Sequence, residues 1–245
     1  MKESTLQKLL DSESVVVLTG AGISAASGVP TFRGADGLWK NYRPEELANY
    51  QAFIRNPELV WGWYSWRRDL IKKVNPNGAH VALVYFERIL NNFFIVTQNV
   101  DNLHQRSGSK NVIELHGNIM HSKCIDCENI YFDEKTYNKE LPHCKHCNSL
   151  IRPAVVWFGE SLPLDALKES QKLAANCQVF LSVGTSAVVE PAASLPFIAR
   201  ERGAYVIEIN KDETPLTPYA DEFIGESVEE YLPELVHHLK TLNLK

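Results

Sequence analysis

The sequence predicts an α/β fold, with a doubly wound, mostly parallel sheet and a second, smaller domain that is helical and binds zinc. Short apolar runs recur along the chain with helical patterns between most of them, which is typical of a parallel sheet covered by helices on both faces. A glycine-containing turn follows the first run, as it does in Rossmann-like sheets. The predicted strands are Val15–Thr19, Phe93–Gln98, Val112–Leu115, Val179–Val183 and Tyr205–Ile209.

Two stretches interrupt this alternation and divide the chain into two predicted domains. Residues 35–77 are rich in aromatic side chains and helical patterns, and residues 119–154 carry cysteine pairs, so both are expected to form the small domain. Residues 1–34, 78–118 and 155–245 then form the larger, Rossmann-like domain. A chain of 245 residues is long enough for one large core and a small satellite.

Composition and charge exclude several classes of function. The net charge of -5 and the lack of a basic run argue against nucleic-acid binding by phosphate neutralisation. No apolar stretch is long enough to span a bilayer. The first residues, MKESTLQKLLDSES, have an amphipathic helical pattern without the apolar core of a secretion signal. We therefore expect a cytoplasmic protein with no membrane partner and no sequence-specific nucleic-acid binding.

The turn after the first strand, TGAG at residues 19–22, has the composition of a ligand-binding turn. Its glycines would let backbone N–H groups approach a ligand, and a helix N-terminus behind them would favour an anion. The third glycine of a full dinucleotide fingerprint does not follow, so an ordinary strand-to-helix turn is the alternative. The next segment, VPTFRG at residues 29–34, is expected to fold over the ligand as a loop.

Four of the five cysteines form two Cys-x-x-Cys pairs, separated by sixteen residues. This spacing is close to that of a four-cysteine zinc site, and an odd cysteine count without a secretion signal favours metal over disulfides. Four thiolates leave no coordination position for water or substrate, so the zinc is expected to be structural. A redox role for one pair is the alternative. The predicted ligands are Cys124, Cys127, Cys144 and Cys147.

Polar residues follow the later strands, at the edge where open α/β sheets bind ligands. The segment QNVD at residues 98–101 follows the second strand, and His116 follows the third. Capping by the polar residues of QNVD and a structural role for His116 remain open from the residues alone. The segments VGTS at 183–186 and INKD at 209–212 follow two more strands, and plain turns are the alternative there.

The stretch 35–77 contains a helix that Asn56-Pro57-Glu58 should start, since these residues supply an N-cap, a proline at the first helical position and an acid in the first turn. Tyr64 and Arg67 lie on its apolar face. In one interpretation Tyr64 is core and Arg67 snorkels or pairs with an internal carboxylate. In the other, the two side chains grip a carboxylate on the substrate.

Together these motifs resemble those of the sirtuins, the NAD-dependent protein deacylases. GAGIS at 20–24 followed by SGVPTFRG at 27–34 carries the resemblance most specifically, and the later motifs extend it over nearly the entire chain. It implies NAD as the cofactor, acyl-lysine proteins or peptides as substrates, and nicotinamide and O-acyl-ADP-ribose as products. Ala26 departs from the glutamate often found there. Thr31 replaces a common aspartate, a change usual in the acidic-acyl branch.

The resemblance also implies roles for individual residues. His116 corresponds to the catalytic base, and Asn99 is placed with it in the catalytic group. The segment QNVD holds nicotinamide and its ribose, while the turns after the later strands contact the phosphates and the adenosine. The implied NAD contacts are Gly20, Ala21, Gly22, Ile23, Thr31, Phe32, Arg33, Trp39, Gln98, Asn99, Val100, Asp101, Gly184, Thr185, Ser186, Asn210, Lys211, Asp212 and Ser227.

On the substrate side, Tyr64-x-x-Arg67 resembles the acidic-acyl-specific branch, often called class III. This implies removal of succinyl, malonyl or glutaryl groups besides acetyl, and Ala35 matches the small residue that leaves room for the longer chain. The extended, exposed-looking segment 152–160 is an edge strand or interdomain packing in one interpretation. In the other, which the resemblance implies, it pairs with the substrate peptide as an added strand. The residues implied in peptide pairing are Val156, Trp157, Phe158, Gly159 and Glu160.

Two other functions remain open from the sequence. An NAD-dependent protein ADP-ribosyltransferase would use the same cleft with a different acceptor. A non-enzymatic module that binds NAD or zinc is the third hypothesis.

Overall fold

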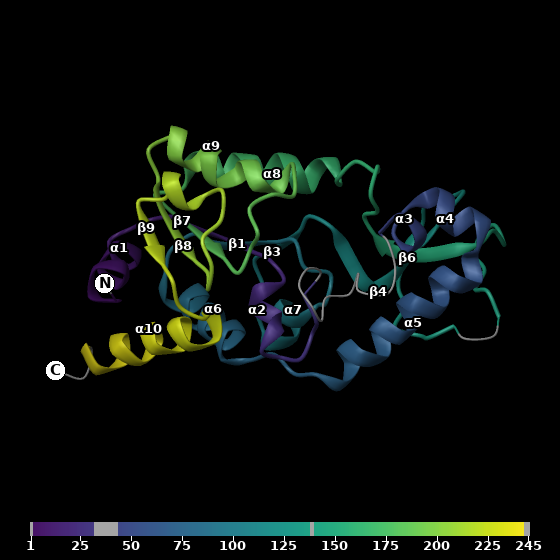
Figure 1. Cartoon of the computed structure of the whole chain (residues 1–245), viewed down its shortest axis with the longest axis horizontal. Helices are drawn as coiled ribbons and strands as arrows, with labels where there is room; N and C mark the ends of the chain where they lie inside the picture. Colours follow the sequence, from purple (N-terminus) through teal and green to yellow (C-terminus); the bar gives the residue numbers. More distant parts are fainter. Residues whose placement is uncertain (1, 32–43, 138–139, 243–245) are drawn as a thin grey trace.

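The computed structural model describes residues 2–31, 44–137 and 140–242, which form a larger and a smaller sheet (Figure 1). In this described part, the larger sheet has six strands in the order β3-β2-β1-β7-β8-β9, and every neighbouring pair is parallel. The first strand lies in the middle, and the order reverses beside it, which is the doubly wound Rossmann arrangement. The predicted fold class is confirmed. The strands are β1 Val15–Thr19, β2 Phe93–Thr97, β3 Val112–Glu114, β7 Val179–Val183, β8 Tyr205–Ile209 and β9 Glu222–Ile224.

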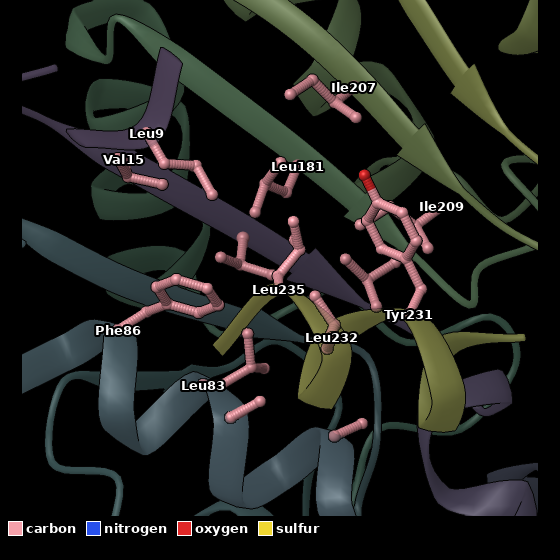
Figure 2. Packing of buried hydrophobic residues seen from close by; sticks show 14 of the residues in the cluster. Leu9, Val15, Leu83, Phe86, Leu181, Ile207, Ile209, Tyr231, Leu232 and Leu235 are labelled. Atoms are coloured by element: carbon pink, nitrogen blue, oxygen red, sulfur yellow. The ribbon is translucent and has the colours of Figure 1, made fainter. Parts of the chain in front are cut away.

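Helices cover both faces of the larger sheet, which explains why its strands are apolar at nearly every position. Val15 and Val17 of β1 face one hydrophobic cluster, and Val16 and Leu18 face another. Figure 2 shows the first cluster, where side chains of three helices meet the sheet. These helices are α1 Lys2–Leu10, α6 Gly78–Ile89 and α10 Val228–Leu242, and the opposite face carries α8 Leu164–Asn176 and α9 Leu195–Glu201.

The smaller sheet is antiparallel, with β4 between β5 and β6. It packs against α5, and the two share a hydrophobic cluster that is separate from those of the larger sheet. The domain boundaries expected from the sequence stay a prediction. The elements on this side are α3 Pro44–Leu47, α4 Tyr50–Arg55, α5 Pro57–Lys73, β4 Gly117–Cys124, β5 Ile130–Phe132 and β6 Ile151–Val155.

The expected start of the helix at Asn56 is confirmed. The Asn56 side chain accepts from the backbone N–H of Leu59 at 3.0 Å, which caps α5. Asn77 caps α6, and His80 completes a capping box with it. The remaining short elements are α2 Gly22–Ala25, α7 Leu103–Ser107 and two 3-10 turns, Ala192–Ser194 and Thr217–Tyr219.

Arg68 fastens α5 to the smaller sheet. Its side chain is fully buried and donates to the carbonyl oxygens of Ile119, Lys135 and His121 at 2.7, 2.6 and 3.0 Å. It also lies 3.5 Å from the carboxylate of Asp133. These bonds satisfy a buried charge that the sequence pattern did not single out. Among the described residues, no helix is long and apolar enough to cross a bilayer.

Candidate active site

The predicted site residues gather where the order of the larger sheet reverses. Because β1 lies between β2 and β7 and all three strands run in parallel, the turns that follow them meet at one edge of the sheet. In open α/β sheets this edge is the ligand-binding position. The three turns contain TGAG, QNVD and VGTS, the segments that the sequence predicts to hold a dinucleotide.

The glycines of these turns are needed because the turns touch each other. A Cβ on Gly22 would lie 2.7 Å from backbone atoms of Gly184, and Gly184 itself has a φ of +59°. Gly20 and Gly22 donate their N–H groups to Val183 and Gly184 at 3.1 and 2.8 Å. The N–H groups of these two glycines are thus bonded inside the protein, and their contacts with NAD stay predictions. Their small size lets the two turns pack at backbone contact.

A buried polar network joins the turn after β1 to the turn after β2. Ser24 donates to Asp101 at 2.7 Å, and the Asn99 amide donates to the carbonyl of Gly20 at 3.0 Å and to Ser24 at 3.2 Å. Asn99 and Asp101 are 6% and 4% exposed. Burial raises the pKa of the Asp101 carboxyl above its usual range, while two hydrogen bonds and the charge of Arg67 act against that shift. Ser24 was not among the predicted site residues.

Behind Asn99 the network continues into the core. Thr97 accepts from the backbone N–H of Asn99 at 3.0 Å and bonds Thr19 at 2.8 Å, and Thr19 lies 2.9 Å from Nε2 of His104. The rings of His104 and His80 are 5.0 Å apart. Burial lowers the pKa of His80 to about 4 and that of His104 to about 3, so both rings are neutral at neutral pH.

His116 lies between β3 and β4, and its ring contacts the QNVD segment. Nδ1 is 3.0 Å from the backbone oxygen of Gln98. A carbonyl only accepts, so Nδ1 carries the proton and Nε2 keeps a lone pair. Burial lowers the pKa of His116 below 6.5, and the bond to Gln98 opposes this shift. The half-buried ring is therefore a neutral base at neutral pH, beside the turns that meet at the sheet edge.

Tyr64 and Arg67 are buried together on α5, at 2% and 6% exposure. The guanidinium carbon of Arg67 lies 4.8 Å from the ring centre of Trp63 and 5.8 Å from that of Tyr64. Burial lowers the pKa of Arg67, whereas Tyr64 and the charge of Asp101 oppose that effect. The pair on α5 is thus electrically coupled to the network at the sheet edge. Burial raises the pKa of Tyr64 to about 12, so its hydroxyl stays protonated.

The segment 152–160 is held by backbone hydrogen bonds within the protein. Residues up to Val155 form β6, which lies at the edge of the smaller sheet beside β4. The edge strand expected as one alternative is therefore present, but it is mostly buried rather than exposed. Beyond it, Val156 donates to the carbonyl of His116 and Phe158 to that of Ala48, both at 2.9 Å. These N–H groups are used inside the protein. The pairing of Val156, Trp157, Phe158, Gly159 and Glu160 with a peptide stays a prediction.

The residues expected around the adenosine lie on the turns after β7 and β8 and before α10. The Asn210 amide donates to the carbonyl of Thr185 at 3.0 Å, which ties the first two turns together. Ser227 donates to Glu230 at 2.6 Å, at the start of α10. The predicted contacts Ser186, Lys211 and Asp212 are exposed. Phe32, Arg33, Ala35 and Trp39 lie outside the described residues, whereas Ala21, Ile23, Thr31 and Val100 lie within them.

The four predicted zinc ligands come together beyond the smaller sheet. The sulfur atoms of Cys124, Cys127, Cys144 and Cys147 all lie within 4.8 Å of one another. Two of the sulfur pairs are separated by 3.4 and 3.5 Å. A tetrahedral zinc with four thiolates would set these edges at about 3.8 Å. The cluster therefore fits one structural zinc ion.

The polar groups at the sheet edge likewise fit a dinucleotide. Buried amide, hydroxyl and carboxylate groups from Asn99, Ser24 and Asp101 lie beside a glycine turn at the position where nucleotides bind open α/β sheets. These groups are suited to ribose hydroxyls and to a carboxamide.

Comparison with known proteins agrees with this geometry. Residues 20–191 match the model of the Sir2 family. The NAD-dependent protein deacylase of Aquifex aeolicus (strain VF5) is 53% identical over 232 residues, which cover 94% of this chain and 97% of that protein.

Two solved structures are also similar. A Sir2 homolog–NAD complex has a TM-score of 0.93 and 50% identity, covering 99% of this chain and 95% of the other. A Sir2 complex with a p53 peptide and NAD+ has a TM-score of 0.86 and 36% identity, covering 98% and 99%. The chain belongs to the Sir2 family, the sirtuins, and is an NAD-dependent protein deacylase.

Proposed function

We propose that this deacylase prefers lysine side chains that carry an acidic acyl group, namely succinyl, malonyl or glutaryl, and that it also removes acetyl. Nicotinamide and O-acyl-ADP-ribose are its products. The observation that carries the proposal is the buried pair on α5. The protonated phenol of Tyr64 lies beside the guanidinium of Arg67, which interacts electrostatically with Asp101.

The chemistry of this pair suits a carboxylate. Arg67 offers a planar fork of N–H donors, and Tyr64 offers a hydroxyl that remains protonated at working pH. A succinyl group ends in an acceptor for these donors, whereas an acetyl group ends in a methyl. Because both side chains are buried, a hydrogen bond to a charged acyl group is screened little by water.

The remaining site residues have separate tasks in the reaction. NAD, when bound, supplies a ribose carbon whose bond to nicotinamide breaks and which takes up the acyl oxygen. In this proposal Asn99 and Asp101 orient the nicotinamide end, and the bonds that Ser24 makes to both support that role. Nε2 of His116 accepts the proton of a ribose hydroxyl, and the bond from Nδ1 to Gln98 keeps the ring in the required tautomer.

The substrate peptide runs beside this site in the proposal. Sir2 relatives bind a p53 peptide together with NAD+, so a protein or peptide substrate is expected here. The segment Val156–Glu160 begins at the residue that is bonded to His116. The N–H groups of Val156 and Phe158 are already used, so the segment would hold the peptide through backbone carbonyl groups. Recognition of this kind tolerates many target sequences.

The variant Arg67→Met tests the acidic preference. Measure kcat/KM on succinyl- and acetyl-lysine versions of one peptide. Loss of a charged hydrogen bond costs about 1.5–3 kcal/mol, so the succinyl-to-acetyl ratio should fall about ten- to a hundredfold. Arg55→Met, at an exposed position on α4, is the matched control and should leave the ratio unchanged. An equal succinyl-to-acetyl ratio in the natural protein and in Arg67→Met would contradict the proposed pocket.

A further inference from the structure

One hydrogen bond joins the segment expected to hold the peptide to the pocket expected to hold the acyl group. The indole Nε1 of Trp157 donates to the hydroxyl oxygen of Tyr64 at 2.8 Å. The two residues are 93 positions apart in the chain, and each is only 2% exposed. Tyr64 lies on α5 and Trp157 follows β6, so the bond links two different elements.

The direction of this bond is fixed by chemistry. An indole nitrogen donates and never accepts, so the Tyr64 oxygen must be the acceptor. Its own proton then has to point to another acceptor, and among the described residues none is bonded to it. The phenol is also protonated at working pH, because burial raises the pKa of Tyr64 to about 12. A buried donor without a partner is costly, which indicates that a ligand supplies the acceptor.

Trp157 is itself held in place by several contacts. The Glu160 carboxylate accepts from the backbone N–H of Trp157 at 2.9 Å and from Arg152 at 2.6 Å. The guanidinium carbon of Arg152 lies 4.1 Å from the centre of the Trp157 ring. The Trp157 ring also packs against Phe53, with 5.5 Å between the two ring centres. The indole therefore cannot turn away from Tyr64 without breaking these contacts.

We propose that Trp157 is a specificity-determining positioning residue. By donating to Tyr64, it turns the phenol proton toward the acyl-binding space, so that the pocket presents a directed donor to an acyl group that ends in a carboxylate. This role rests on the proposed acidic preference and adds to it a residue outside the Tyr-x-x-Arg pair. It assigns the selectivity to the indole N–H rather than to the bulk of the ring.

A double-mutant cycle tests the proposal. Measure kcat/KM on the succinyl- and acetyl-lysine peptides for the natural protein, Tyr64→Phe, Trp157→Phe and the double variant, with thermal unfolding to confirm that each is folded. Tyr64→Phe removes a hydrogen bond to a charged carboxylate, so its succinyl-to-acetyl ratio should fall about ten- to a hundredfold. Trp157→Phe removes only the neutral indole bond that orients the phenol, so its ratio should fall about three- to tenfold. The double variant should fall no further than Tyr64→Phe, since Trp157 acts through Tyr64.

The outcomes separate the two claims. An unchanged ratio in Tyr64→Phe contradicts the acidic pocket and, with it, the role of Trp157. A lowered ratio in Tyr64→Phe together with an unchanged ratio in Trp157→Phe overturns only the role of Trp157. Effects that multiply in the double variant overturn it as well, because Trp157 would then act independently of Tyr64.

A second variant guards against loss of packing, since phenylalanine is smaller than tryptophan. Benzothienylalanine, introduced at position 157 by amber suppression, keeps the shape of the indole and replaces its N–H with sulfur. The succinyl-to-acetyl ratio should fall as far as in Trp157→Phe. A ratio equal to that of the natural protein shows that the ring alone is sufficient and contradicts the proposal.

Discussion

His116 is the residue on which the proposed chemistry depends. Its place at the end of a strand is evident from the sequence, but its tautomer is not. The backbone oxygen of Gln98, which follows a different strand, fixes the proton on Nδ1 and leaves Nε2 free to accept. Burial then lowers its pKa below 6.5, which favours the neutral form that a base requires.

The pH dependence of turnover should reflect this neutral base. Protonation abolishes the lone pair on Nε2, so kcat/KM falls as the pH drops through the pKa of His116. Because that pKa is below 6.5, the midpoint of the acid limb should also lie below 6.5. A pH profile of kcat/KM for one acyl peptide measures it. A midpoint well above 6.5 would contradict the environment described for the ring.

Removal of the imidazole gives a sharper test at the same residue. General-base catalysis contributes about 10²- to 10⁴-fold, so His116→Ala should lose that much in kcat. Calorimetry should show NAD binding retained, since Asn99, Asp101 and Ser24 bond one another without His116. Unchanged turnover in His116→Ala would assign the base to another residue.

Individual site residues could be identified from the sequence only where they belong to a short local motif. The cysteine pairs and the pair on α5 carry such motifs. Ser24, Arg68 and the bond between Trp157 and Tyr64 do not, because their partners lie far away in the chain. For Ser24 a signal was present, since it closes the GAGIS stretch, but its role as a bridge appears only when the turns meet.

At the scale of elements, α5 and the smaller sheet depend on each other. The sequence predicts the start of α5 and one apolar stripe on it. In the structure Trp61 and Arg68, which are outside that stripe, are also fully buried. A wider face of the helix is buried than the spacing of its apolar residues indicates, because the smaller sheet packs against it.

Arg68 should therefore be essential for stability. Arg68→Met leaves the Asp133 carboxylate without its cation and three carbonyl groups without a donor. Removing one partner of a buried ion pair typically costs about 3–5 kcal/mol of the free energy of unfolding. Urea denaturation of Arg68→Met, compared with Arg55→Met at an exposed position, measures this. Equal unfolding free energies for the two variants would contradict the role given to Arg68.

Zinc removal should act on the same module. The four cysteines join two turns whose residues 126–129 and 145–148 are exposed, so metal binding is expected to supply much of their folding energy. A strong chelator should release one zinc per chain and raise hydrogen exchange in β4, β5 and β6. Strands β1 and β7 should keep their protection at first. Unchanged exchange after complete zinc loss would show that the cluster is dispensable.

Short elements account for most of what could not be predicted. β9 and β5 have only three residues each, which is too short for a recognisable strand pattern, and β5 is largely exposed. β6 contains a proline and an arginine, so its sequence lacks the apolar pattern that is typical of a buried strand. Five strands of the larger sheet were predicted within one residue of their ends, because four of them, β1, β2, β7 and β8, are buried on both faces and almost continuously apolar.

At the scale of the whole molecule, the site lies over a core that contains two neutral histidines. His80 is on α6 and His104 on α7, and the hydrogen-bond chain from His104 reaches Asn99 through Thr19 and Thr97. Their burial favours neutral rings in the folded state, whereas unfolded histidines titrate near 6.5. The fold should therefore lose stability in acid.

The sign and size of this loss follow from proton linkage. Below pH 6.5 both histidines bind protons in the unfolded state. In the folded state they stay neutral down to their pKa values, about 4 for His80 and about 3 for His104. Each histidine then lowers the free energy of unfolding by about 1.4 kcal/mol per pH unit. His104→Gln should flatten this slope by up to one proton, while His237→Gln, at an exposed position, should not. Identical slopes would show that His104 is not neutral in the folded protein.

One competition experiment tests the central claim most directly. Equal amounts of succinyl- and acetyl-lysine versions of one peptide are incubated with NAD, and mass spectrometry counts both peptides, nicotinamide and the ADP-ribose products. We predict that the succinyl peptide is consumed first, with one O-succinyl-ADP-ribose formed for each nicotinamide released. Consumption of the acetyl peptide first would contradict the acidic pocket. Release of nicotinamide with ADP-ribose attached to protein would contradict the proposed reaction.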